Sequence, residues 1–307
     1  PLLLSVRSGA PVSMPGMMET VLDIGLCDAT VNGLLRHRGN PRLVWDAYRR
    51  LVCGFGEVVM GIDPAVFEAD QLAVLGDPAR HADDFVELRA LTRAHLASVQ
   101  RVSGQPFPQD PQTQLARAIG AVFDSWQAPK AQRWRQLKGL DGAMGTAVTV
   151  QRMVFGNGGG RSGAGVGFTR HPSSGEPQPW VDFLFDAQGE DVVSGRRSAP
   201  GHEALAQRLP EAWAALCEAC GTLERAFTDM QDIEFTVEDG RLWLLQTRDG
   251  KRTPQAAARI ALDLADEGLI DRATARQRTE GLDADTLALT RLAGAEETPL
   301  EIGRAHV

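Results

Sequence analysis

Acidic and apolar residues alternate in the stretch 231–248, which predicts two β-strands joined by a tight turn. From Asp232 to Val237 every second position is apolar, the period expected of a strand with one buried face. Asp232 and Glu234 therefore share the polar face. Two carboxylates on one face repel each other, so the pair suits either a solvated edge strand or a site that binds a cation.

The turn of this hairpin admits two registers. A two-residue loop at Asp239 and Gly240 puts Gln246 on the apolar face of the hairpin. A three-residue loop that also takes in Glu238 puts Gln246 beside the two carboxylates. The sequence leaves both registers open.

Apolar residues recur with the helical period in much of the remaining chain. Helices are predicted over 41–52, 83–102, 110–137 with a restart at Pro129, 202–227 with an interruption at Pro210, and 254–267, and one or two more begin within 270–291. Strand patterns fall at 2–7, 146–155, 164–170 and 180–187. The helical region in the first half is interpreted as an all-helical insertion.

Residues 8–25 are rich in glycine, proline, serine and methionine, which predicts a long shaped loop. Its methionines Met14, Met17 and Met18 offer a polarizable apolar surface. The loop therefore either packs against the fold or receives a flat ring such as a purine.

Composition narrows the class of protein. The chain has 307 residues, 43% hydrophobic and 23% charged, with a net charge of −8, as in an ordinary globular protein. No run of Lys or Arg points to nucleic acid, no apolar stretch is long enough for a membrane span, and the start is too short for a signal peptide. We therefore expect a cytoplasmic protein without nucleic-acid or membrane partners. Cys217 and Cys220 form a C-x-x-C within a predicted helix and are interpreted as apolar helix residues rather than zinc ligands.

Seven glycines fall within 156–167. Glycine at this density lets backbone N–H groups surround phosphate oxygens without side-chain clashes. We interpret the run as a hairpin loop laid over a nucleotide and assign Gly163 and Gly165 to ATP binding. A merely flexible hairpin is the alternative.

Several motifs together resemble the ATP-grasp nucleotide-binding domain of the pyruvate, phosphate dikinase family, over residues 2 to about 269. They are SVRSGA at 5–10, SMPGMMET at 13–20, FDSW at 123–126, GTAV at 145–148, QGEDVV at 188–193, QDIEF at 231–235 and LQTR at 245–248. The resemblance implies an α+β fold with mixed or antiparallel sheets and a helical insertion.

The resemblance also implies binding of ATP and magnesium, and pyrophosphoryl transfer to a histidine on a separate swivelling domain. The parent enzyme would be a homodimer that converts ATP, phosphate and pyruvate into AMP, pyrophosphate and phosphoenolpyruvate. Residue by residue, it assigns Arg7 to ATP phosphate, Asp232 and Glu234 to magnesium and nucleotide, Gln246 to a place beside them, and Arg50, Glu190, Asp191 and Arg248 to phosphoryl transfer. Asp182 stands where the family usually has Glu, and its role is left open.

The expected organisation has five parts. They are 1–25, a remnant of the N-terminal ATP-grasp subdomain; 26–141, the helical insertion; 142–269, the subdomain with the glycine-rich loop and the carboxylates; 270–300, a linker toward a missing phosphohistidine domain; and 301–307, an artefact that matches a sequencing adapter. We expect the N-terminal part of the ATP-grasp domain to be incomplete and this chain alone to be inactive. The alternatives are a stand-alone nucleotide-binding or regulatory module and part of a related phosphoenolpyruvate synthase-type dikinase.

Overall fold

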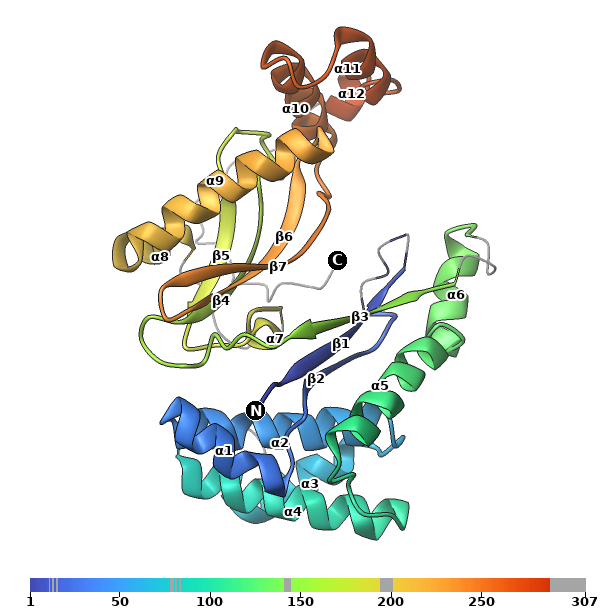
Figure 1. Cartoon of the computed structure of the whole chain (residues 1–307). Helices are drawn as coiled ribbons and strands as arrows, with labels where there is room; N and C mark the ends of the chain where they lie inside the picture. The colour runs from blue at the N-terminus through green and yellow to red at the C-terminus, as the bar shows by residue number, and fades with distance from the viewer. Residues whose placement is uncertain are drawn as a thin grey trace, which may run out of the picture. The chain divides into compact units, whose positions relative to one another are not determined.

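Figure 1 shows the computed structural model of the chain, which divides into two units, Pro1–Met153 and Val154–Val307. The structure describes residues 1–10, 12, 14, 16–77, 80, 82, 84–140, 145–193 and 201–287. The predicted artefact at 301–307 and the last part of the predicted linker lie outside the described residues. Among the described helices, none combines the length and apolar character needed to cross a membrane.

The first unit joins a small sheet to a group of helices. Its elements are β1 (Leu4–Gly9), β2 (Thr20–Ile24), α1 (Asp28–Arg38), α2 (Pro41–Val58), α3 (Pro64–Leu75), α4 (Phe85–Ser103), α5 (Pro111–Ser125), α6 (Pro129–Leu137) and β3 (Ala147–Arg152). The strands form an antiparallel sheet in the order β2-β1-β3. Helix α2 contacts both β2 and α4, and it buries Val44, Ala47, Leu51 and Phe55 at helical spacing.

The segment 8–25 is not a loop throughout. Strand β2 occupies its second half, because Val21 and Ile24 are buried and pair with β1. Met14 is buried against Trp126, with Met17 and Met18 packed beside it. The packing alternative therefore accounts for Met14.

The second unit is built on a four-stranded antiparallel sheet in the order β5-β4-β6-β7. Its elements are β4 (Gly163–Phe168), β5 (Trp180–Phe185), α7 (Gly189–Val193), α8 (His202–Arg208), α9 (Pro210–Phe227), β6 (Gln231–Glu238), β7 (Arg241–Asp249), α10 (Pro254–Asp266), α11 (Arg272–Arg278) and α12 (Ala284–Leu287). The predicted combination of helices with antiparallel sheets, an α+β fold, is confirmed.

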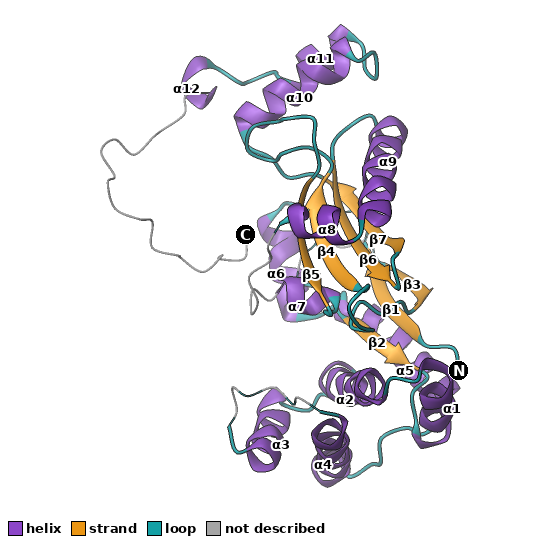
Figure 2. Cartoon of the chain, turned by 90° about the vertical axis from the view of Figure 1, so that its left-hand side faces the viewer, coloured by secondary structure: helices purple, strands orange, loops and turns teal. Residues whose placement is uncertain are grey.

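Helices α8 and α9 cover one face of this sheet (Figure 2). Leu205 of α8 and Leu216 of α9 pack against Phe183, Phe235 and other side chains of that face. Alternate residues point to opposite faces of a strand, so the polar residues of β6 lie on the other face. The sheet thus separates an apolar side under the helices from the side that carries the carboxylates.

The glycines of β4 make room for aromatic rings on the helix-covered face. Gly165 lies between its partners Phe183 and Phe235, whose rings stack over it with centroids 5.9 Å apart and an interplanar angle of 9°. A Cβ at Gly165 would lie 2.3 Å from Cζ of Phe235, and one at Gly163 would lie 2.3 Å from Cζ of Phe183. Larger residues would exclude these rings.

The division after Met153 differs from the predicted boundary after residue 141. Strand β3, which the sequence assigned to the second subdomain, pairs with β1 from Leu4–Arg152 to Gly9–Ala147. This long-range pairing places 147–152 in the first unit, together with the predicted parts 1–25 and 26–141.

Candidate functional site

The β6–β7 hairpin turns through two residues. Asp239 and Gly240 have φ values of 52° and 84°, and Glu238 pairs with Arg241 across them. Positive φ at both central positions is the requirement of a type I′ turn, which glycine meets without steric cost. The first of the two predicted loop lengths is therefore confirmed.

The register of the hairpin changes beyond the turn. Phe235 still pairs with Leu244, but Glu234 pairs with Gln246, so Leu245 is an extra residue in β7. An extra residue of this kind is a β-bulge, and it reverses which side chains of the bulged strand face which side. Gln246 therefore lies beside Glu234 despite the two-residue turn, a combination that neither predicted register contained.

Beyond the bulge, Arg248 pairs with Asp232. Residues directly opposite one another in antiparallel strands share a face, so four predicted site residues lie together on the side of the sheet away from α9. They are Asp232, Glu234, Gln246 and Arg248.

Arg248 links the two carboxylates. Its Nη2 donates a hydrogen bond to Oε1 of Glu234, and its Nε lies 3.8 Å from Oδ2 of Asp232. The side chains of Arg248, Asp232 and Glu234 are 25%, 29% and 22% exposed. Water therefore screens the attraction between the guanidinium and the two carboxylates only in part. Burial and the neighbouring Glu234 charge raise the pKa of Asp232, while Arg248 and Lys251 oppose that rise.

A third carboxylate belongs to the same face. Asp182 of β5 pairs with Val166 of β4, and Val166 pairs with Glu234 of β6. Two strand spacings put Asp182 about 10 Å from Glu234 across the sheet. Asp182 is 6% exposed, and the alternation of 180–185 indicates its direction, because Val181 and Phe183 face the helices.

Glu190 and Asp191 lie elsewhere in the second unit, on the short helix α7. This helix follows β5, whose last residue Phe185 pairs with Gly163 near the β6–β7 turn. The Asp191 carboxylate accepts a 2.9 Å hydrogen bond from the backbone N–H of Gln188. Glu190 and Asp191 thus follow the end of β5 that lies near the β6–β7 turn. Asp232 lies at the opposite end of the sheet, at the start of β6.

The glycine-rich loop is attached to the same turn. The N–H of Gly240 donates to the carbonyl of Arg161 at 2.8 Å, and the N–H of Asp239 donates to Oγ of Ser162 at 3.0 Å. Strand β4 begins at Gly163, one residue earlier than predicted. Gly163 therefore joins Gly165, which the predicted strand already contained, in β4. Ring packing accounts for the absence of a side chain at both positions, and their assignment to ATP stays a prediction.

Arg7 and Arg50 belong to the first unit. Arg7 lies on β1 between Thr20 and Thr149 of the neighbouring strands. Arg50 lies on α2, where its Nε is 2.9 Å from Oδ2 of Asp46. Burial raises the pKa of Asp46, but the guanidinium groups of Arg50 and Arg49 outweigh this effect and lower the pKa to about 2.

A family model described as pyruvate phosphate dikinase, AMP/ATP-binding domain, matches residues 1–212 and 200–269. The chain belongs to this family. The resemblance found in the motifs is thereby confirmed.

Three curated dikinases are almost half identical to the chain over the part that aligns with it. It is 49% identical to a pyruvate, phosphate dikinase of Rhizobium meliloti (strain 1021), over 94% of the chain and 34% of that protein. It is 47% identical to a chloroplastic pyruvate, phosphate dikinase of Flaveria trinervia and 46% identical to pyruvate, phosphate dikinase 2 of Zea mays, over 94% of the chain and 30% and 33% of those proteins. The chain spans about a third of the length of these dikinases.

The carboxylate face fits the kind of magnesium site that a nucleotide completes. Among the described residues, no group of three or more His, Cys, Asp or Glu side chains is close enough to hold a metal by itself. Magnesium in nucleotide sites commonly takes one or two carboxylates and fills its remaining positions with water and phosphate oxygens. Asp232 and Glu234 supply that number of carboxylates, and Gln246 adds an amide beside Glu234.

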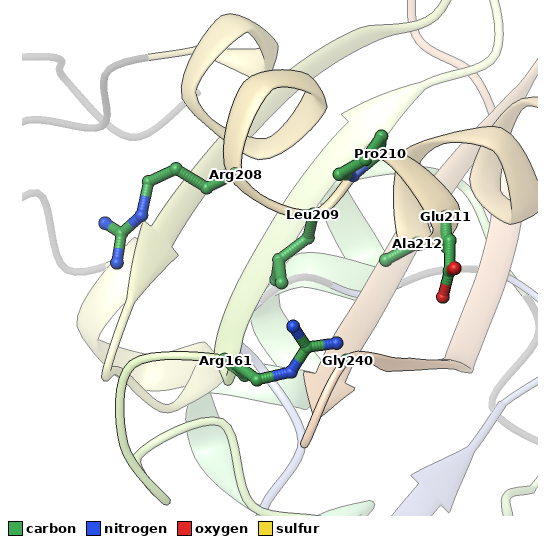
Figure 3. A pocket seen from close by; sticks show the side chains of 7 residues that line it. All are labelled: Arg161, Arg208, Leu209, Pro210, Glu211, Ala212 and Gly240. Atoms are coloured by element: carbon green, nitrogen blue, oxygen red, sulfur yellow. The ribbon is translucent and has the colours of Figure 1, made fainter.

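A small pocket of the second unit is lined by residues other than the predicted site residues (Figure 3). Its volume is about 150 Å³, and it is lined by Arg161, Arg208, Leu209, Pro210, Glu211, Ala212 and Gly240. None of the ten residues assigned to the site lines this pocket. The Arg208 guanidinium lies 3.7 Å from the centre of the Phe185 ring and donates to the Gly160 carbonyl at 3.3 Å.

Proposed function

We propose that this chain is the ATP-binding part of a pyruvate, phosphate dikinase, the enzyme that converts ATP, phosphate and pyruvate into AMP, pyrophosphate and phosphoenolpyruvate. Membership of the AMP/ATP-binding family and the name of the relatives support the activity. The observation that carries the site is the bulge at Leu245, which brings Gln246 and Arg248 to the face of Asp232 and Glu234.

In this proposal Asp232 and Glu234 hold magnesium together with the ATP phosphates. Magnesium supplies positive charge to the phosphate oxygens, which is the main requirement of phosphoryl transfer. The planar guanidinium of Arg248 suits a second contact to phosphate, and Gln246 positions a polar group next to Glu234. Asp182 is a further candidate because it lies in the same cross-strand row as Glu234.

The remaining assignments rest on the family resemblance. Arg7 is proposed to contact ATP phosphate, and Arg50, Glu190 and Asp191 to act in the transfer step. The acceptor is a histidine on a swivelling domain, in an enzyme that forms a homodimer. A cytoplasmic location stays a prediction from composition; the Flaveria relative is described as chloroplastic.

Isothermal titration of the 307-residue chain with Mg·ATP tests the proposal. Glu234→Gln removes one carboxylate charge with little change of shape, and we expect it to weaken Mg·ATP binding on the order of tenfold or more. The matched control is Glu218→Gln, an exposed acid on α9 on the far side of the sheet, which should leave affinity unchanged.

Equal affinities for the wild type and Glu234→Gln would contradict the site. Binding that depends on Glu234 in the chain, combined with unchanged dikinase turnover when the same substitution is made in a complete dikinase, would favour the stand-alone binding module.

A further inference from the structure

Arg248 is already paired with Asp232 and Glu234, the two carboxylates that the proposed function assigns to magnesium. Its Nη2 is bonded to Oε1 of Glu234, and its Nε faces Oδ2 of Asp232 at 3.8 Å. The Nε is buried and has no hydrogen-bond partner within bonding distance. The guanidinium therefore sits between two acceptors and satisfies only one of them fully.

We infer that Arg248 is a resident counter-ion of this site, which a divalent cation must displace from Asp232 and Glu234 in order to bind. The inference rests on the proposed function, because it assumes that these carboxylates take the metal. It adds that metal binding is an exchange of cations and not the filling of a preformed anionic cavity.

The geometry of the ligands explains why the two cations compete. Magnesium needs carboxylate oxygens at about 2.0–2.1 Å in a near-octahedral arrangement, and it shares no lone pair with an N–H donor. The Glu234 lone pair that accepts from Arg248 is thus occupied, and the positive charge of a guanidinium that stays between the two carboxylates repels a divalent cation that binds there. Without any cation, the two carboxylates would repel each other on adjacent positions of one strand face.

After the exchange, the displaced Arg248 side chain needs a new hydrogen-bond acceptor, and the phosphates of a nucleotide can supply one. A guanidinium that leaves a carboxylate needs another acceptor, because an unpaired charge in a partly buried site is unfavourable. Phosphate oxygens match its planar fork. A nucleotide that arrives with the metal would therefore accept Arg248 as the metal binds the two carboxylates. The bulge at Leu245 is what places Arg248 on the same face as Asp232 and Glu234.

Binding of Mn²⁺ alone to the 307-residue chain, followed by the electron paramagnetic resonance signal of free Mn²⁺, tests the exchange. Arg248→Met removes the competing cation, and we expect it to tighten Mn²⁺ binding on the order of tenfold, the value of a charged hydrogen bond that no longer has to be broken. Arg248→Lys retains the charge without the planar fork and should fall between Met and the wild type.

Lys251→Met is the matched control for charge alone. Lys251 is exposed and acts on Asp232 through space, so its removal should tighten Mn²⁺ binding by no more than roughly twofold to threefold. Glu234→Gln is included to show that the measured Mn²⁺ is bound at this site.

The outcomes separate the two proposals. If Mn²⁺ binding depends on Glu234 but Arg248→Met tightens it no more than Lys251→Met, the exchange is wrong and the metal site stands. If neither the wild type nor Arg248→Met binds Mn²⁺, or if Glu234→Gln binds it as well as the wild type, the exchange is wrong. The proposed function, in which the metal arrives with the nucleotide, then stands or falls with the Mg·ATP titration of Glu234→Gln. Tightening specific to Arg248 in a Glu234-dependent site supports both.

Discussion

Substituting Gly165 by alanine tests whether this glycine serves packing or nucleotide binding. Its Cβ would lie 2.3 Å from Cζ and 2.7 Å from Cε1 of Phe235, and 3.0 Å from the carbonyl oxygen of Asp182. Contacts this short force the Phe235 ring away from its stacked position over Phe183. Both rings are almost fully buried, so the displaced ring has no empty space to enter.

The expected cost follows from these contacts. Overpacking a buried site costs about 1–3 kcal/mol, and loss of the ring stacking costs about 0.5–1.5 kcal/mol more. The lower entropy of an unfolded chain with alanine returns about 0.4–1 kcal/mol. We therefore expect Gly165→Ala to lower the free energy of unfolding by about 2 kcal/mol.

Urea unfolding followed by circular dichroism measures this change. Gly160→Ala is the matched control, because that glycine is exposed in the loop before β4 and an added Cβ would meet nothing within 4 Å. The double variant Gly165→Ala/Phe235→Leu should lose less stability than the sum of the two single variants, since the clash and the ring are removed together.

Two results would refute the packing explanation. One is wild-type stability of Gly165→Ala combined with lost Mg·ATP binding, which would restore the nucleotide-binding role predicted from the sequence. The other is strict additivity in the double variant, which would show that Phe235 does not respond to the new methyl group.

Three further predictions concern charge, register and thiol reactivity. The pKa of Asp46 is lowered from 3.8 to about 2, so the contribution of its charge to stability is complete above about pH 4 and is lost as the pH falls through 2. Asp46→Asn should therefore lower the free energy of unfolding by about 2 kcal/mol at pH 7 and weaken the fall of the urea midpoint between pH 4 and pH 2. An equally steep fall of the midpoint in the variant would contradict this. Deleting Leu245 removes the bulge but leaves Gln246 opposite Glu234, so Mg·ATP affinity in a titration should change by less than about threefold; complete loss would show that the bulge itself is needed. Burial raises the pKa of Cys220 to about 12, so mass spectrometry after alkylation at pH 8 should find Cys220 modified in urea and protected in the native chain, and equal modification in both would contradict its burial in α9.

The strands of the hairpin could be predicted from sequence because their alternation is local. The register could not, because a bulge is one additional residue and Leu244 and Leu245 are both leucines. Nothing in the pattern marks which of them is extra. The sequence did narrow the turn to two loop lengths. Only the pairing of Glu234 with Gln246 shows how a two-residue turn allows Gln246 to lie on the same face as Asp232 and Glu234.

The glycines of 156–167 show a different limit. A loop that binds phosphate and a strand that makes room for rings on neighbouring strands both need residues without side chains. The distinction depends on Phe183 and Phe235, which flank Gly165 only after the sheet has formed. The same holds for β3, whose partner β1 lies at the other end of the first unit in sequence.

A crystal of the chain grown with Mn²⁺ and a non-hydrolysable ATP analogue would show directly whether Asp232 and Glu234 hold the metal. The anomalous signal of manganese locates the ion without reference to any assumed site. We expect a peak about 2.0–2.3 Å from carboxylate oxygens of Asp232 and Glu234, with the Arg248 guanidinium turned to the phosphates. A nucleotide-bound manganese away from this face, with Arg248 still paired to Glu234, would contradict this expectation.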